Sequence, residues 1–413
     1  MRNLPGHLGT IAGLLALSGC YAEQVSTEVE EVAGPQVAVA APPTPAPAPS
    51  PSPVPTPTPT PAGSPVTVGP DASGIRQLAS ISSNFDPASM LAGTPVPDSA
   101  DPDVVGAFRF TCKPSHLAYD DPIVFPNQKG RTHLHQFFGN TLADANSTYE
   151  SLRTSGESTC VNELNRSAYW VPALMDGQGS VVLPEDITIY YKRRPASDPV
   201  CQTGKGCIAM PRGLRYVFGR QMDGVLRPKD HVHFRCNGGT SGAHFETLPE
   251  AAAVCPVGAR IIAAVESPDC WDGINLDSPD HRSHMAYQIS VQGQPACPDT
   301  HPYRMARLTM GVVYKVTDSL DRSGDLSTSR RTWYFSSDRM EGMTPQVSGT
   351  TFHADWYGAW DDDILKEWTD NCIDKKLNCS FGRLGSDRMM QAGDAVRRST
   401  HGVTVAIPLR LTS

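Results

Sequence analysis

Residues 259–291, ARIIAAVESPDCWDGINLDSPDHRSHMAYQISV, combine the two kinds of sequence that decide the fold. The segment begins and ends with runs that have the β-branched or alternating pattern of strands, at 259–265 and 284–291. Between them, residues 267–287 contain a cysteine, four aspartates, a tryptophan and two histidines, and are rich in turn formers. A polar segment of this length between strands is typical of a functional loop.

The same pattern recurs along the chain, with spacers rich in Gly, Pro, Asp and Ser. Further strands are expected at residues 104–112, 187–192, 214–218, 231–236, 308–316, 332–335 and 403–411. Helices are expected only at 87–91, where Asp86 is the cap, at 248–254 and at 361–376. The sequence therefore predicts a mainly β fold: a β-sandwich or jelly-roll-like domain with long disulfide-stapled loops and few helices.

The first twenty residues resemble a bacterial lipoprotein signal. A weak positive charge at Arg2 precedes a short apolar run at 8–17, which ends in Leu17-Ser18-Gly19-Cys20. We expect a signal peptide at 1–19 and lipidation of Cys20, which would anchor the protein to membrane lipid on the extracytoplasmic side of the bacterial cell envelope. The alternative is an ordinary secretory signal with an incidental cysteine.

A proline-rich tether is expected at 20–73, because proline recurs at nearly every second position between 43 and 61. Such a segment prefers extended polyproline II and could reach on the order of 100 Å from the membrane. The rest, 74–413, is long enough for one large domain or two joined ones. The net charge of −8 predicts no nucleic-acid partner, and the oligomeric state stays open.

The cysteine count fits an exported protein. Eleven cysteines are present, and ten remain if Cys20 is lipidated, enough for five disulfides. Proximity favours Cys201–Cys207 and Cys372–Cys379 most. Weaker pairings are Cys270–Cys297, Cys236–Cys255 and Cys112–Cys160. A zinc cluster is the alternative, but the chain has no C-x2-C pair.

Four histidines are candidates for one site. His133 and His135 are spaced so that a strand would present both imidazoles on one face, and His281 and His284 could converge on a turn. Asp280 or Asp277 could add an oxygen or orient a histidine. The alternatives are that the first pair reflects polar-face composition and that the second pair locks a long loop. His231 and His233 are interpreted as structural.

These histidines give two overlapping hypotheses. The predicted catalytic residues are His133, His135, His281, His284 and Asp280. The predicted metal ligands are His133, His135, His284, His353 and Asp355, with Zn or Cu as the ion. Calcium is a weaker possibility at the acidic positions of 272–280, although their spacing is not that of an EF-hand.

Aromatic residues supply a predicted substrate surface for a sugar. It comprises Tyr169, Trp170, Trp356, Trp360 and Asp361. The alternative is that such aromatics cap a sheet. Trp271 is interpreted as a core residue packed on a disulfide.

Several motifs in a fixed order resemble a family of secreted proteins of uncharacterised function, common in fungi and in bacteria such as actinomycetes. They are Asp121-Pro122-Ile123-Val124, His133-Leu134-His135-Gln136-Phe137-Phe138-Gly139, residues 167–172, residues 211–215, residues 270–284, Cys297-Pro298, His353-Ala354-Asp355 and Gly358-Ala359-Trp360-Asp361. The resemblance covers residues 105–375. It does not include the lipoprotein motif at 17–20 (the lipobox) or the proline-rich tether. In fungi the family often accompanies carbohydrate-binding WSC modules. It therefore implies secretion and a polysaccharide context, without an established reaction.

Two classes of function follow. The first is a hydrolase or lyase acting on polysaccharide, in which a metal activates water or a histidine acts as general base with an aspartate as orienter or acid. The second is a non-catalytic glycan-binding or cell-wall-associated module.

Overall fold

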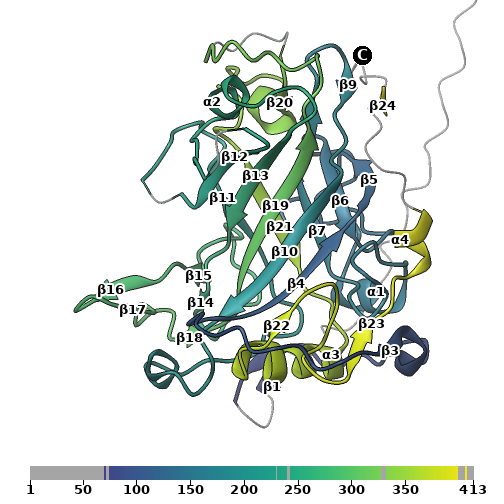
Figure 1. The fold of residues 1–413 in the computed structure, drawn as a ribbon, viewed down its shortest axis with the longest axis vertical. Helices are drawn as coiled ribbons and strands as arrows, with labels where there is room; N and C mark the ends of the chain where they lie inside the picture. Colours follow the sequence, from purple (N-terminus) through teal and green to yellow (C-terminus); the bar gives the residue numbers. More distant parts are fainter. Residues whose placement is uncertain are drawn as a thin grey trace, which may run out of the picture. The chain divides into compact units, whose positions relative to one another are not determined.

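The structure, a computed structural model, describes residues 69–70, 74–228, 230–239, 242–326, 332–398 and 405–406. The predicted signal peptide, Cys20 and nearly all of the tether lie outside these residues, as does most of the strand expected at 403–411. The described residues are mainly β with few helices, which confirms the predicted fold class (Figure 1). None of the helices among them is long and apolar enough to span a membrane.

Two large sheets form the body of the domain. The first has the order β12-β13-β19-β10-β4-β22 and is antiparallel except that β22 runs parallel to β4. Its strands are β12 (Val232–Asn237), β13 (Arg260–Glu266), β19 (Arg307–Lys315), β10 (Asp186–Arg193), β4 (Gly106–Cys112) and β22 (Asn378–Cys379). The second has the order β11-β21-β7-β6-β5 and is antiparallel. Its strands are β11 (Arg215–Gly219), β21 (His353–Tyr357), β7 (Ala168–Pro172), β6 (His135–Gly139) and β5 (Pro114–Ala118).

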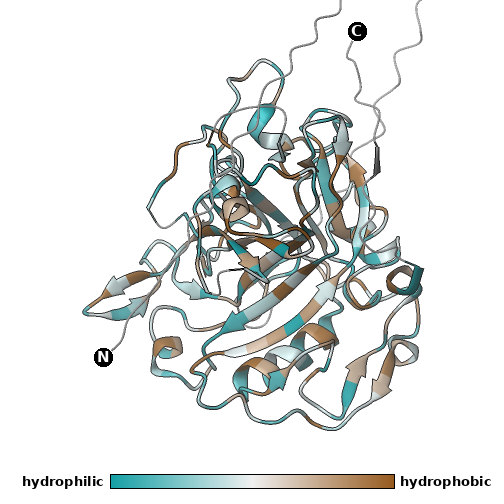
Figure 2. Ribbon diagram, turned by 45° about the horizontal axis from the view of Figure 1, so that its top comes forward, coloured by the Kyte–Doolittle hydropathy of each residue, from teal (hydrophilic) through white to brown (hydrophobic). Residues whose placement is uncertain are grey.

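One face of each sheet contributes to a common core. From the six-stranded sheet, β10 buries alternate residues, including Ile187, Ile189 and Tyr191. From the five-stranded sheet, Tyr169 and Trp356 join the same apolar cluster. Figure 2 shows hydrophobic and hydrophilic residues alternating along strands, which is the pattern that leaves one face of a sheet for the core.

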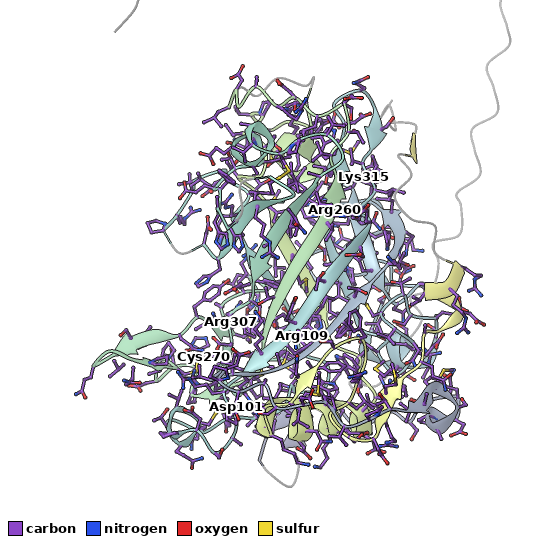
Figure 3. The ribbon with its side chains drawn as sticks, in the orientation of Figure 1. Asp101, Arg109, Arg260, Cys270, Arg307 and Lys315 are labelled. Atoms are coloured by element: carbon purple, nitrogen blue, oxygen red, sulfur yellow. A yellow bond between two sulfur atoms is a disulfide. The ribbon has the colours of Figure 1, made fainter. Side chains whose placement is uncertain are left out.

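The outward face of the six-stranded sheet is polar. Arg109, Arg260, Arg307 and Lys315 lie along its strands (Figure 3), and the first three are partnered by side chains or carbonyls of the same region. The five-stranded sheet differs, because every residue of β6, β7 and β21 is buried. Both of its faces are therefore covered by protein.

Small elements complete the domain. Short strands are β1 (Gly69–Pro70), β2 (Arg76–Gln77), β3 (Leu91–Gly93), β8 (Leu174–Met175), β9 (Ser180–Val181), β14 (Cys270–Trp271), β15 (Met285–Ala286), β16 (Ile289–Val291), β17 (Gln294–Ala296), β18 (Tyr303–Arg304), β20 (Tyr334–Phe335), β23 (Arg388–Met390) and β24 (Val405–Ala406). Helices are α1 (Tyr149–Thr154), α2 (Leu248–Ala253), α3 (Asp362–Trp368) and α4 (Asp394–Arg398), with 3-10 turns η1 (Pro87–Met90), η2 (Pro199–Gln202) and η3 (Ser336–Arg339) and a π-helical turn η4 (Thr369–Asp374).

Two predicted elements differ in the structure. The strand expected at 284–291 is split into β15 and β16, because β15 pairs with β14 whereas β16 forms its own hairpin with β17. The helix expected at 361–376 changes from α3 to the π-helical turn η4 at Thr369. The turn expected at 87–91 is present as η1, and the Asp86 side chain accepts a hydrogen bond from the Ala88 N–H.

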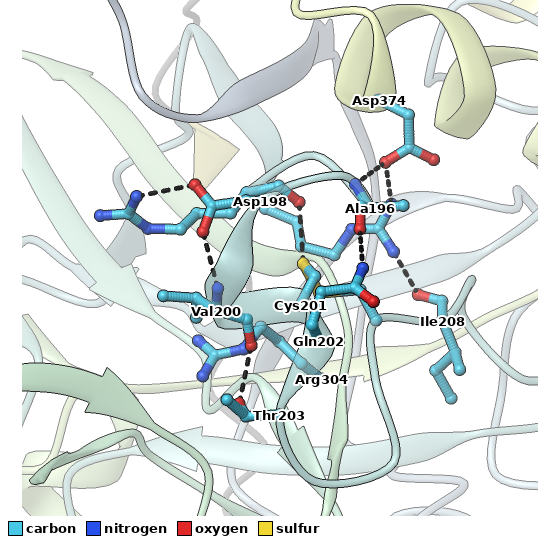
Figure 4. The surroundings of a disulfide bond; sticks show 12 residues. Ala196, Asp198, Val200, Cys201, Gln202, Thr203, Ile208, Arg304 and Asp374 are labelled. Atoms are coloured by element: carbon cyan, nitrogen blue, oxygen red, sulfur yellow. Dashed lines mark hydrogen bonds and ion pairs between the residues drawn. A yellow bond between two sulfur atoms is a disulfide. The ribbon is translucent and has the colours of Figure 1, made fainter.

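All five predicted disulfides are present: Cys112–Cys160, Cys201–Cys207, Cys236–Cys255, Cys270–Cys297 and Cys372–Cys379. Polar contacts support the loop closed by Cys201–Cys207, the shortest of the five disulfide loops (Figure 4). Asp198 accepts from the Val200 N–H at 2.9 Å, and Asp374 accepts from the Ala196 N–H at 2.8 Å. The Cys270–Cys297 disulfide links the polar 267–287 segment to the chain that follows it. Trp271 in this segment is fully buried, which agrees with its interpretation as a core residue.

Candidate metal centre

Two strands of the five-stranded sheet begin with histidines of the cluster. His135 is the first residue of β6 and lies opposite Pro172 of β7. His353 is the first residue of β21, and the register between β21 and β7 places it at the same height along the strands as His135. Both imidazoles are on the face opposite the shared core. His133 precedes β6 in a bend and not in a strand, yet its ring centroid is 4.2 Å from that of His135 and 5.2 Å from that of His353. One potential ligand atom from each of the three histidines lies within 4.8 Å of the other two.

Hydrogen bonds fix which nitrogen of the His135 and His353 rings faces the cluster. His135 Nδ1 is 3.0 Å from the Asp120 carbonyl oxygen and His353 Nδ1 is 2.8 Å from the Thr351 carbonyl oxygen. A carbonyl only accepts, so both Nδ1 atoms donate and each Nε2 carries a lone pair. The Nε2 atoms of His133 and His135 are buried and have no hydrogen-bond partner among the described residues. Metal-ligating histidines typically donate their other ring N–H to a backbone carbonyl or a carboxylate in this way.

Burial keeps all three imidazoles neutral. It lowers the pKa of His133 well below its ordinary value, lowers that of His135, and lowers that of His353 to about 3. A neutral imidazole is the form that binds a metal, since the proton otherwise competes for the same lone pair.

Two aspartates lie beside the histidines. Asp121, His135 and Asp355 each offer a ligand atom within 4.8 Å of the others. Asp121 Oδ1 accepts from the N–H groups of Ile123 and Val124, both at 2.8 Å. Both Asp355 oxygens are buried without a hydrogen-bond partner in the described part of the chain, and Oδ2 is 3.9 Å from His353 Nε2.

A cation would relieve the charge conflict in this cluster. Burial, followed by the nearby Asp121 carboxylate, raises the pKa of Asp355 well above its ordinary value, while Arg282 opposes the rise. The Arg282 guanidinium is itself held by the carbonyl oxygens of Gly219 and Arg220, at 3.1 and 3.3 Å. Buried carboxylates are otherwise expensive unless they are paired or coordinate a metal.

The donor set fits one transition-metal ion. His135 belongs to both groups of ligands but has a single free nitrogen, so both groups converge on one position. Three imidazole nitrogens with one or two carboxylate oxygens suit Zn, Cu, Fe or Ni, whereas Ca takes oxygen ligands. The residues therefore fit an ion such as Zn²⁺.

The structure does not bring the loop histidines into this cluster. His284 uses both nitrogens, with Ser278 Oγ at 2.7 Å and the Arg215 carbonyl oxygen at 2.9 Å. His281 Nδ1 is 2.8 Å from Asp277 Oδ1. These contacts agree with the alternative in which the two histidines lock the loop. The loop reaches the cluster through Arg282 instead.

The acidic groups of the loop are also occupied. Asp280 Oδ1 accepts from the Ser278 hydroxyl at 2.7 Å and from the N–H and hydroxyl of Ser283 at 2.9 and 2.7 Å. Burial opposes them, but these bonds still hold the pKa of Asp280 well below its usual range. Asp272 accepts from the N–H groups of Ile274 and Asn275. The two groups of side chains able to hold a metal among the described residues do not include these loop aspartates.

The predicted sugar-binding aromatics are core residues. Tyr169, Trp170, Trp356 and Trp360 are at most 4 % exposed. The Tyr191 hydroxyl is 2.8 Å from that of Tyr169 and accepts from Trp360 Nε1 at 3.1 Å. Asp361 pairs with the buried Arg153 at 3.2 Å. Because these rings are buried in the core, a sugar cannot stack on them. The prediction that they form a sugar-binding surface is therefore wrong.

This chain belongs to the family described as a domain of unknown function, DUF1996. The match covers residues 121–360, more than half of the chain. It spans the whole cluster, from Asp121 through His133, His135 and His353 to Asp355. No curated protein and no solved structure matches the chain.

A cavity of about 440 Å³ adjoins the cluster within this family domain. His133 and Leu134 line it together with Tyr119, Arg131, Tyr334 and Arg339. His133 is partly exposed, whereas His135 and Asp355 are at most 1 % exposed. His133 is thus the member of the cluster shared with the cavity.

Sequence reasoning found His133, His135, His353 and Asp355 but assigned no role to Asp121 or Arg282. Asp121 is the first residue of one family motif, and Arg282 lies between His281 and His284 in another. No local sequence pattern indicates that either residue lies beside the histidine cluster, because the segments that meet there are distant in sequence.

Proposed function

We propose that this protein is a metal-dependent hydrolase, with Zn²⁺ or a similar ion held by the Nε2 atoms of His133, His135 and His353. The observation that carries the proposal is the convergence of three neutral imidazoles, two of them fixed through Nδ1 to backbone carbonyls. In this proposal only the three imidazoles coordinate the ion and the carboxylates of Asp121 and Asp355 lie beside it, so a coordination position would remain for water, as in catalytic zinc sites.

The ion would lower the pKa of a bound water to about 7. His133, His135 and His353 would hold the ion, and Asp355, whose Oδ2 is 3.9 Å from His353 Nε2, would be the residue able to take up a proton from water and pass it to the leaving oxygen. In the net reaction, water would add across the bond between the electrophilic carbon of the substrate and its leaving oxygen, which would depart as a hydroxyl. The reaction needs no oxidant or reductant.

The proposed substrate is a polysaccharide of the cell envelope or its surroundings, and the proposed place is the outer side of a bacterial membrane, where acylated Cys20 and the proline-rich segment would hold the domain. The lipobox at 17–20, the proline pattern and the five disulfides support export. The cavity of about 440 Å³ beside His133 is of a size suited to a small substrate unit.

A non-catalytic metal site is the main rival. It is favoured by the deep burial of His135, His353 and Asp355, since a structural site is closed by a fourth protein ligand. The partial exposure of His133 to the cavity favours the catalytic alternative.

The test measures the metal content of the purified full chain by elemental analysis, and its turnover on a panel of glycans with and without chelator. We expect about one ion per chain, and His135→Ala and His353→Ala should lose both the ion and turnover. His281→Ala is the matched control and should keep both. Absence of metal in the wild-type protein under zinc-replete conditions refutes the metal site. One tightly bound ion without turnover on any glycan favours the structural site, and turnover that survives metal removal favours metal-free acid–base catalysis.

A further inference from the structure

The cavity beside His133 has a lining that points to the chemistry of its ligand. Arg131 and Arg339 both line it, while Glu341 is the single acidic residue there. The lining therefore carries two guanidinium groups and one carboxylate, in a chain whose net charge is −8.

We infer that this cavity binds a sugar unit bearing an oxyanion group, a carboxylate, sulfate or phosphate. The inference rests on the proposed function for the position of the scissile bond, since His133 belongs to both the cavity and the metal cluster. Planar guanidinium groups recognise carboxylate, phosphate and similar oxyanions through paired hydrogen bonds, which makes arginine the usual residue for this purpose.

The two arginines come from separate segments that meet at the cavity. Arg131 lies in the loop before His133 and is exposed, so it can reach a ligand at the entrance. Arg339 ends η3, and its guanidinium carbon is 4.0 Å from the centroid of the Tyr334 ring. Stacking on an aromatic face holds a guanidinium in a defined plane and lowers the entropy lost when it binds a ligand.

The remaining lining residues suit the body of a sugar. Tyr119 and Tyr334 add phenol groups, and Thr132 adds a hydroxyl. Met175 and Met340 contribute apolar surface of a kind that adapts to a ring's shape. A cavity with a few polar groups among apolar ones is the usual form of a small-molecule site.

Electrostatics would also orient the substrate. A metal ion bound at the histidine cluster would add positive charge next to the same cavity, so an anionic unit would be attracted to the end of the cavity where hydrolysis is proposed. A neutral sugar of the same size gains none of this attraction.

The test uses calorimetric titration of the purified full chain, both metal-loaded and metal-free, with three probes: trigalacturonate, a sulfated galactose trisaccharide and neutral galactotriose. At least one acidic probe should bind 10-fold or more tightly than the neutral one. Arg131→Gln and Arg339→Gln should each weaken that binding about 10-fold, with a smaller effect at high salt. Arg227→Gln is the control, because Arg227 is an exposed arginine paired with Asp223 away from this cavity.

Equal binding of all three probes overturns the inference, as does an absence of binding or a lack of effect of both arginine variants. Because Arg131 is exposed, its variant should fold even if Arg339→Gln does not. Failure of the proposed function gives a different result: the chain holds no metal, yet the acidic probe still binds in an arginine-dependent way.

Discussion

Asp338 provides a test of the packing around the histidine cluster. It is fully buried, and its two carboxylate oxygens accept from the N–H groups of Phe335, Gly349 and Thr351 and from the Thr351 hydroxyl. The Thr351 carbonyl in turn accepts from His353 Nδ1. Asp338 therefore supports the residue that orients a proposed ligand.

Burial raises the pKa of Asp338 from 3.8 to about 6, despite the hydrogen bonds that oppose it. Between these two pH values the folded protein binds a proton that the unfolded chain has released. The free energy of unfolding therefore falls as the pH rises through this window. A pKa difference of about two units corresponds to about 3 kcal/mol in full, of which about 2 kcal/mol is lost between pH 4 and pH 7.

Asp338→Asn removes this titration, because asparagine does not ionise. We expect the difference in unfolding free energy, wild type minus variant, to decrease by about 2 kcal/mol between pH 4 and pH 7. A constant cost of the altered hydrogen bonds, about 1–3 kcal/mol for one backbone N–H left without an acceptor, does not affect this slope.

Urea unfolding at several pH values, with chelator present and disulfides intact, measures the effect. Asp299→Asn is the matched control for the substitution itself, because Asp299 is exposed in a turn. If the wild-type and Asp338→Asn curves remain parallel between pH 4 and pH 7, Asp338 does not titrate in this window and the reasoning is wrong.

Three other changes test separate parts of the structure. Replacing Cys270 and Cys297 together by serine opens a disulfide with a sequence separation of 27, which should lower the free energy of unfolding by about 3–4 kcal/mol in chemical denaturation. Arg282→Gln removes the cation that favours ionised Asp355 and should weaken metal affinity about 10- to 100-fold in competition with a chelator. Trp360→Ala should cost about 3–5 kcal/mol of stability without changing the affinity for a glycan of the remaining folded protein, because Trp360 is buried; a selective loss of glycan binding would restore its role in substrate contact.

Local patterns in the sequence were enough to predict the main strands and the disulfides. Alternation in β10 follows from one face being buried, and this pattern is visible in residues 187–192 alone. Each disulfide joins two cysteines that follow one another in the sequence, at separations from 6 to 48 residues, so pairing each cysteine with its neighbour gave the right set. The split of 284–291 was not predictable, because the choice of β14 or β17 as pairing partner depends on distant segments.

The candidate site was predictable only in part. His133 and His135 were identified by their spacing, and His353 with Asp355 by the same alternation on β21. His284 resembled a ligand in sequence, but its nitrogens bond within the loop and to Arg215. His281 has a φ of 58°, an uncommon left-handed conformation, and its ring pairs with Asp277. Such a backbone reversal is not encoded by the i, i+3 spacing, which assumes a regular turn.

The two faces of the five-stranded sheet explain why the cluster lies where it does. One face carries Tyr169 and Trp356 into the shared core, and the opposite face carries His135, His353 and Asp355 beneath covering loops. The strands pack against the core through one face, and their hydrogen-bonded register fixes the positions of the side chains on the opposite face. Such strands are a rigid support for ligands that must converge within a few ångströms. Three imidazoles and two carboxylates in so small a buried space are costly without a cation, since unpaired polar groups lose their hydration. The cost of this arrangement would be offset by a bound metal ion, which is the relation expected of a binding site and not of a core formed for stability.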